Sequence, residues 1–322
     1  MRLSALKFDP YVLAILAAVG VAALFPVHGA AVAPFGLFTK ATIAILFFLY
    51  GARLAREAVI AGLLHWRLRV FVLSVTFVVY PLIGLGIGAV FDGLFASGLM
   101  LTGVLYLTCL PSTIQSSVAF VATARGAVAT AVCTASASQL VGVFITPLLV
   151  GLLLRTQGVQ VPLSAIEGII LQVLAPFIVG QIVHPWMGAW AAKNRFVLSL
   201  FDRGVIILMV YSAFSAAVVA GVWKQITWAD IGITAAICAV LLAVILTSLI
   251  LLARAFKFSV EDETVIAFCG SQKGLTIGIA LAGFLFPPAQ AGLIVLPVMI
   301  YHQFQLISCA FLAQRYARRP AN

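Results

Sequence analysis

The sequence has few charged residues for its length. Asp, Glu, Lys and Arg make up 9% of 322 residues, whereas 64% are hydrophobic and the mean hydropathy is +1.19. A soluble domain is about 25% charged, so most of this chain cannot face water and must face lipid. Backbone amides in lipid must be satisfied internally, which leaves helices or a closed barrel. Apolar runs such as 231–252 lack the alternation of barrel strands. We therefore expect an all-α membrane protein.

The residue patterns of enzymes and metal sites are also missing. The sequence contains no HExxH motif and no CxxC pair, and its nine acidic residues fall in predicted loops or near the ends of apolar runs. Catalysis would need paired acids, a metal-ligand helix or a nucleophile–base pair, so we predict no enzyme and no metal site. The five cysteines are typical of small buried residues. The net charge is +10, but the charges flank the apolar runs and no folded face is left to bind nucleic acid, which we exclude as a partner.

What the sequence does contain is a series of apolar runs bounded by charges, Pro or Gly. We expect ten transmembrane helices, with the first run kept as a helix although it resembles a cleavable signal peptide. The predicted spans are 10–27, 34–52, 68–91, 98–123, 127–154, 163–187, 203–222, 230–253, 263–286 and 290–313.

Positive charge supports this number of spans. With the N-terminus, the even-to-odd loops and the C-terminus on one side, that side holds 15 of the 19 basic residues and the other holds three. The positive-inside rule then predicts that both termini are cytoplasmic. The fifteen are Arg2, Lys7, Arg53, Arg56, Arg67, Arg69, Arg125, Lys193, Arg195, Arg203, Arg254, Lys257, Arg315, Arg318 and Arg319; the three are Lys40, Arg155 and Lys224. These basic residues lie in loops or near span ends, whereas Lys273 is left inside a span.

The two halves of the chain, 1–160 and 161–322, resemble each other in spacing. The segment 109–117 lies 160 residues before 269–277, and each is a polar patch in the fourth span of its half. Five spans per half is an odd number, so the second half would enter the membrane inverted. Inverted repeats are typical of secondary transporters.

These two patches differ from ordinary intramembrane polar residues. Ser74, Thr76, Thr247 and Ser248 are expected only to bond their own helix backbone. In the patches, Pro and Gly weaken the helix, and unwound backbone at mid-depth is tolerated only against protein or a water-filled cavity. We predict two broken, crossing helices (spans 4 and 9) whose half-helix ends bind substrate or ion; the alternative is two ordinary kinks. The predicted breaks are Pro111, Gly270 and Gly274, and the binding residues are Ser112, Thr113, Gln115, Ser116, Ser117, Ser271, Gln272, Lys273 and Thr276.

The spans after each patch are also polar and are expected to line the same cavity. Span five contributes Ser136, Ser138 and Gln139, and span ten contributes His302 and Gln303. For His302, a hydrogen-bonded packing histidine is an equally good interpretation.

Three motifs resemble the bile acid:sodium symporter superfamily, solute carrier family 10, and most of all its member-7-like branch, which includes bacterial proteins. They are Cys109-Leu-Pro-Ser-Thr-Ile-Gln-Ser-Ser-Val118, Ser136-Ala-Ser-Gln-Leu-Val-Gly-Val-Phe-Ile-Thr-Pro-Leu-Leu149 and Phe268-Cys-Gly-Ser-Gln-Lys-Gly-Leu275. The resemblance covers essentially the whole chain. It implies a panel domain of spans 1, 2, 6 and 7, a core domain of spans 3–5 and 8–10, and cotransport of organic anions with sodium. The localisation it implies is the bacterial inner membrane.

The sodium motif of that family, Glu-x-Gly-x-Gln-Asn, is altered here. Phe268 stands at the Glu position and Lys273 at the Asn position, and Ser116-Ser117 replaces Ser-Asn. We therefore expect no cofactor and doubt sodium coupling, although bound Na⁺ stays an alternative. Three interpretations of Lys273 are open: a tethered cation in place of sodium, a proton carrier, or a structural lysine bonded to carbonyls at a helix break.

The sequence thus predicts a secondary active transporter of a small organic anion that works by alternating access. The alternatives are a non-transporting membrane sensor or binding protein and a cation/proton antiporter relative. The partners expected are an anionic small molecule and the lipid bilayer. The oligomeric state is not predicted.

Overall fold

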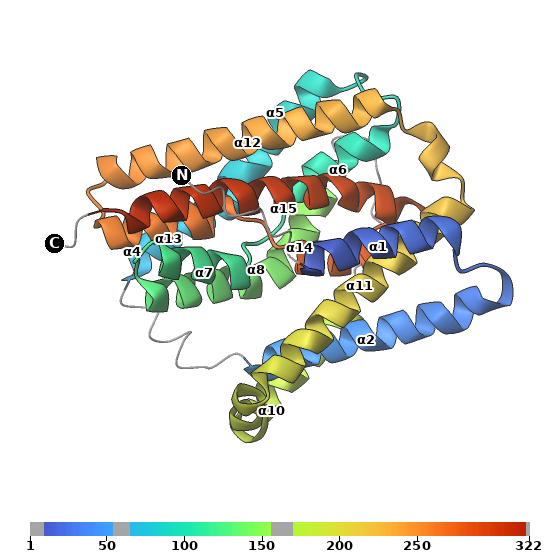
Figure 1. Cartoon of the computed structure of the whole chain (residues 1–322), viewed down its shortest axis with the longest axis horizontal. Helices are drawn as coiled ribbons and strands as arrows, with labels where there is room; N and C mark the ends of the chain where they lie inside the picture. Colours follow the sequence, from blue (N-terminus) through green and yellow to red (C-terminus); the bar gives the residue numbers. More distant parts are fainter. Residues whose placement is uncertain (1–9, 54–64, 156–169, 320–322) are drawn as a thin grey trace.

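The computed structural model describes residues 10–53, 65–155 and 170–319, and all regular structure in these ranges is helical (Figure 1). The prediction of an all-α protein is therefore confirmed for them. The elements are α1 (Pro10–Leu24), η1 (Gly29–Ala31), α2 (Val32–Arg53), α4 (Trp66–Ser74), the π-helical η3 (Val75–Val79), α5 (Tyr80–Phe91), α6 (Gly98–Thr108), α7 (Gln115–Thr123), α8 (Val128–Arg155), the π-helical η4 (Ile170–Leu174), α10 (Ala175–Lys193), α11 (Arg195–Val219), η5 (Val222–Gln225), α12 (Trp228–Ala255), α13 (Val260–Ser271), α14 (Leu275–Leu285) and α15 (Pro288–Ala317).

Seven helical segments of the described chain are long and apolar enough to cross a membrane, and Leu13–Leu24 and Gly98–Thr108 are shorter apolar helices. This is fewer than the ten spans expected. The predicted span 98–123 is divided between α6 and α7, and the predicted span 163–187 is described only from Ile170 onward. The basic residues Arg2, Lys7 and Arg56 lie outside the described residues. The ten-span inverted repeat therefore stays a prediction.

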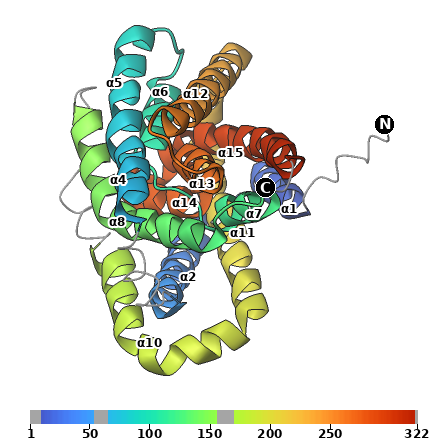
Figure 2. The ribbon, with the colours of Figure 1, turned by 90° about the vertical axis from the view of Figure 1, so that its left-hand side faces the viewer.

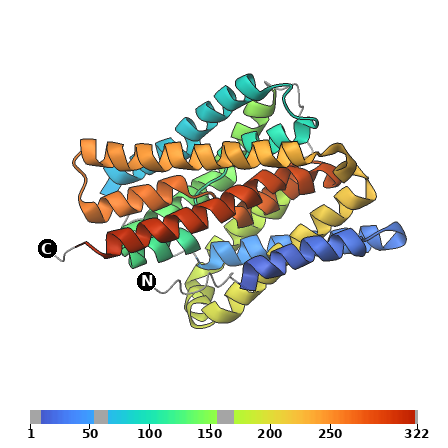
Figure 3. The same ribbon diagram turned by 45° about the horizontal axis from the view of Figure 1, so that its top comes forward.

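The helices form two groups. In one, α2 packs on α10 and α1 packs on α11; Figure 2 shows α2, α10 and α11 below the larger group. In the larger group, α12, α13 and α15 run beside one another (Figure 3), and α6 packs on α15. The α13–α14 segment lies at the centre of this group and is almost entirely buried. Contacts of α11 with α15 and α14 join the two groups.

N-terminal caps explain where α12 and α13, the two helices before the second polar patch, begin. The Thr227 hydroxyl accepts the Asp230 N–H, and the Asp230 carboxylate accepts the Thr227 N–H at 2.8 Å, which is a capping box for α12. Asp230 also accepts the Ala96 N–H at 2.9 Å, which holds the loop before α6. Ser259 caps α13, whose first turn carries three acidic residues that favour the positive end of the helix dipole.

Two glycines let α2 and α10 approach very closely. A Cβ added at Gly51 would lie 2.1 Å from the Phe177 carbonyl oxygen, and one added at Gly180 would lie 2.0 Å from that of Phe48. Small residues at such positions are the usual means of close helix packing in membranes. This contact fixes the α2–α10 pair as one unit.

Helix α11 begins earlier than the sequence predicted. The expected span was 203–222, whereas α11 runs from Arg195 to Val219 and buries Leu198 and Asp202 on one face. The charged residues lowered the local hydropathy and moved the predicted boundary toward the C-terminus. Asp202 and Arg203 consequently lie within a helix instead of at its start.

Candidate functional site

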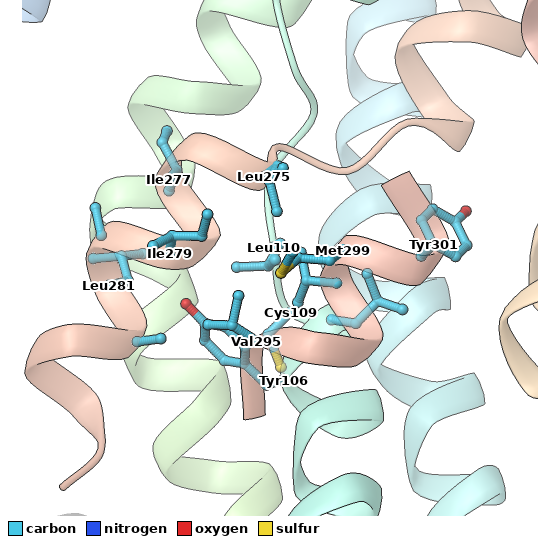
Figure 4. Close-up of a cluster of buried hydrophobic side chains, with 14 of the residues drawn as sticks. Tyr106, Cys109, Leu110, Leu275, Ile277, Ile279, Leu281, Val295, Met299 and Tyr301 are labelled. Carbon is cyan, nitrogen blue, oxygen red and sulfur yellow. The ribbon is translucent and has the colours of Figure 1, made fainter. Parts of the chain in front are cut away.

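Both polar patches interrupt a helix, and the interruptions touch. Helix α6 ends at Thr108 and α7 begins at Gln115, while α13 ends at Ser271 and α14 begins at Leu275. The Gly274 N–H donates to the Pro111 carbonyl at 2.8 Å, so one break satisfies a backbone group of the other. In Figure 4, Leu110 and Leu275 from the two segments lie beside Met299 of α15.

The prediction that Gly270 breaks the helix is wrong. Gly270 is helical and lies within α13, one residue before its end. A Cβ there would lie 2.9 Å from the Leu249 Cδ1 atom of α12. Its small size serves close helix packing, and the backbone leaves the helix only after Ser271.

Helix α8 holds the backbone of the first break, between α6 and α7. The Ser138 hydroxyl accepts the Ser112 N–H at 3.0 Å, and the Thr146 hydroxyl donates to the Cys109 carbonyl at 2.8 Å. These backbone groups have no helical partner because the helix has ended. Ser138, which we expected to bind substrate, thus holds the backbone of the break.

Helix α15 supports the second break through Gln305. The Gln305 Oε1 atom accepts the Lys273 N–H at 2.8 Å, and Nε2 donates to the Lys273 carbonyl at 3.0 Å. The hydroxyls of Tyr80 and Tyr301 each lie 2.8 Å from the Ser271 carbonyl oxygen and 2.7 Å from each other, so two hydroxyl hydrogens serve these three contacts. The sequence predicted His302 and Gln303, neighbours of Gln305, as binding residues but not Gln305 itself.

The Lys273 side chain is 1% exposed and ends among backbone carbonyls. Its Nζ donates to the carbonyls of Thr76, Thr108 and Leu110 at 3.2, 3.2 and 2.7 Å. Nζ also lies 3.7 Å from the centre of the Tyr80 ring. In the described part of the chain, no carboxylate is among its hydrogen-bond or ion-pair partners.

At the positions where the family that this chain resembles has ion ligands, the side chains of this chain make other contacts. Phe268 is fully buried, with its ring 5.9 Å from that of Phe120 and 6.4 Å from that of Tyr316. The Gln272 Oε1 atom accepts the hydroxyls of Ser116 and Ser117 at 2.5 and 3.1 Å. Among the described residues, no group of three His, Cys, Asp or Glu side chains could hold a metal ion.

A cavity of about 590 Å³ adjoins the two breaks and lies between the two helix groups. Its lining comes from α1, α2, α10 and α11 on one side and from α7, α8, α14, α15 and the breaks on the other. Eight predicted binding residues line it: Thr113, Gln115, Ser116, Ser136, Gln139, Thr276, His302 and Gln303. Six do not: Ser112, Ser117, Ser138, Ser271, Gln272 and Lys273.

Helices α7 and α14 both begin at this cavity. Gln115 and Ser116 at the start of α7 line it, as do Leu275 and Thr276 at the start of α14. Neither helix has a side-chain N-cap. Early N–H groups and the positive ends of two helix dipoles are therefore directed toward the cavity, which favours an anion there.

The other side of the cavity carries charged residues that the sequence placed in loops or at span ends. Arg53 and Asp202 form a two-point ion pair, with N–O distances of 2.6 and 3.1 Å. The Arg203 guanidinium lies 5.3 Å from the centre of the Tyr11 ring. Two arginines against one aspartate leave the cavity wall with one net positive charge.

The network around Gln305 also orients His302. Gln305 Nε2 and His302 Nδ1 are 2.7 Å apart, and an amide nitrogen can only donate. Nδ1 is therefore the acceptor, and in a neutral ring Nε2 carries the hydrogen. His302 thus presents an N–H on a ring that lines the cavity.

This arrangement defines the class of protein: a helical integral membrane protein with interrupted helices around an internal cavity, as in transporters. The profile of the SBF-like CPA transporter family (DUF4137) matches residues 9–318, so the chain belongs to that family. It is a transporter-family protein and not an enzyme.

Individual relatives agree with this assignment. "Uncharacterized protein PA2026" of Pseudomonas aeruginosa is 49% identical over 97% of this chain and 93% of the relative. "Putative symporter YfeH" of Escherichia coli K12 is 43% identical over 97% of this chain and 93% of the relative. "Sodium/bile acid cotransporter 7-A" of Xenopus laevis is 26% identical over 95% of this chain and 90% of the relative. The resemblance to solute carrier family 10 is thereby confirmed.

Proposed function

We propose that the chain is a secondary active transporter that moves a small organic anion through the cavity by alternating access. The observation that carries the proposal is the cavity wall, which is formed jointly by the two helix groups. A relative movement of the groups would change the access to a ligand held at the breaks. The relatives named as a symporter and as a sodium/bile acid cotransporter support transport of a small solute.

The charge of the cavity supports an anionic substrate. Arg53 is neutralised by Asp202, so Arg203 supplies the net positive charge, and two helix N-termini approach from the other side. Apolar side chains such as Phe47, Phe177 and Leu140 also line the cavity. A substrate with one anionic group and an apolar body matches this lining.

We place the molecule in the bacterial inner membrane as a ten-span inverted repeat with both termini in the cytoplasm. The positive-inside rule and the paired breaks support this arrangement. In this orientation the connection between α10 and α11 at Asn194 faces the cytoplasm.

Uptake into proteoliposomes tests the function. Radiolabelled monocarboxylates, sulfonates and dicarboxylates would be offered to liposomes with and without the protein. We expect protein-dependent uptake of a monoanion, and a loss of affinity of about 10- to 100-fold for Arg203→Gln, since a charge-assisted hydrogen bond contributes about 1.5–3 kcal/mol. Arg195→Gln, an exposed change on the same helix outside the cavity, should behave as wild type. Binding of an anion without any protein-dependent uptake would instead favour a sensor.

A further inference from the structure

Three backbone carbonyls converge where the described chain offers them no helical donor. In η3, the Tyr80 N–H bonds the Val75 carbonyl, five residues back. The next N–H in that pattern would serve the Thr76 carbonyl, but residue 81 is proline and has none. The π-helical turn and Pro81 together leave the Thr76 carbonyl without a helical donor.

The end of α6 supplies the other two carbonyls. Pro111 has no N–H, and the Ser112 N–H is taken by the Ser138 hydroxyl, so neither serves the Thr108 carbonyl. The Leu110 carbonyl lies beyond the end of the helix. A buried carbonyl without a donor costs about 1–3 kcal/mol, and three close together also concentrate negative potential.

Lys273 supplies what these carbonyls lack. An ammonium has three N–H donors, and Nζ has three carbonyl acceptors, at 2.7–3.2 Å. A neutral amine has only two donors, so one carbonyl would face its lone pair. The Tyr80 ring, 3.7 Å from Nζ, adds the aromatic face that cations prefer. The geometry therefore matches the charged form.

We propose that the Lys273 ammonium is a built-in cation: it occupies a site of three carbonyls and one aromatic ring that would otherwise suit a free monovalent cation. This ammonium joins η3, the end of α6 and the α13–α14 break. The site therefore needs no sodium in the transport cycle. The statement that the transport cycle needs no sodium rests on the proposed transport function. The cation site itself does not rest on it.

Chemical rescue of stability tests the site without any substrate. The purified variant Lys273→Ala removes the ammonium and its stem and leaves the carbonyls in place. We expect a lower Tm in choline chloride and a dose-dependent recovery with methylammonium or potassium, because a ligand that binds only the folded state stabilises it. The matched variant Lys273→Met keeps an apolar stem in the site, so it should be destabilised but not rescued.

Wild type provides the test that depends on no variant. Its Tm should be the same in sodium chloride and in choline chloride at equal ionic strength. The proposal is overturned if sodium specifically stabilises wild type, if Lys273→Met is as stable as wild type, or if small cations fail to rescue Lys273→Ala. If Lys273→Ala does not fold, the charged variant Lys273→Arg must retain more stability than Lys273→Met. Failure of anion uptake in proteoliposomes would leave these results unaffected.

Discussion

Gln305 provides both backbone hydrogen bonds of Lys273, accepting from its N–H and donating to its carbonyl. A side-chain amide on α15 thereby takes the place of helix bonding at the point where α13 has ended. Lys273 and Gln305 are buried in the protein, so water does not take the place of these bonds. The break is therefore held open by a neighbouring helix and does not depend on the flexibility of its own glycine.

The first prediction concerns the two hydrogen bonds between Gln305 and the Lys273 backbone. Gln305→Ala leaves two buried backbone groups without partners, so we expect a loss of about 2–5 kcal/mol of unfolding free energy. Thermal unfolding in detergent measures it as a lower Tm. Gln314→Ala, an exposed change on the same helix, is the control and should have no effect. Equal stability of the two variants would show that the break satisfies itself in another way.

The second prediction concerns the contact of α2 with α10. An added methyl group in Gly51→Ala would overlap the Phe177 carbonyl, since the Cβ position is 2.1 Å from that oxygen. Overpacking costs about 1–3 kcal/mol, so the Tm should fall. Gly36→Ala lies on the same helix with nothing within 4 Å and should be neutral or slightly stabilising. A normal Tm for Gly51→Ala would mean that the two helices separate without cost.

The third prediction concerns orientation. Arg195 begins α11 and Lys224 follows its other end, and both are exposed. The 25 residues of α11 give a length of about 37 Å, enough to cross the hydrocarbon core. We expect Arg195→Cys to react with an impermeant maleimide only from the cytoplasmic face, and Lys224→Cys only from outside.

The parent protein provides the background for this labelling. Four of its five cysteines are buried and Cys133 is partly buried, so little labelling is expected without an introduced cysteine. Labelling of Lys224→Cys from the cytoplasmic face would reject the proposed topology.

The places of the two helix breaks were predictable from their own segments, although Gly270 is not the residue at which α13 ends. Pro111 removes a donor within its own segment, and polar residues in an apolar run identify the place. The partners of Lys273 were not predictable in this way. Thr76 was expected only to bond its own helix, and its hydroxyl does donate to the Val72 carbonyl. The Thr76 carbonyl is available to Lys273 because Thr76 lies in a π-helical turn, and this turn is far from Lys273 in the sequence, since the two residues are 197 positions apart.

The charged cavity wall was missed for a different reason. Hydropathy places Arg53, Asp202 and Arg203 in loops or at span ends, since it counts each charge separately. Arg53 and Asp202 lie 149 residues apart in the sequence and cancel each other across two helices. Only the packing of α2 against α11 shows that this pair lines the cavity and leaves Arg203 as the net charge of the wall.

The π-helical turn at Val75–Val79 also has a consequence for the helical phase of the whole segment. A π turn holds one residue more than an α turn, so it shifts the faces of α4 and α5 by about 100° relative to each other. A single-residue deletion here would restore a regular helix without lengthening any loop. It would also rotate the Tyr80 ring away from the ammonium while α4 kept its packing. The spacing between α4 and α5 is thus part of the Lys273 site, because it sets the direction of the Tyr80 ring.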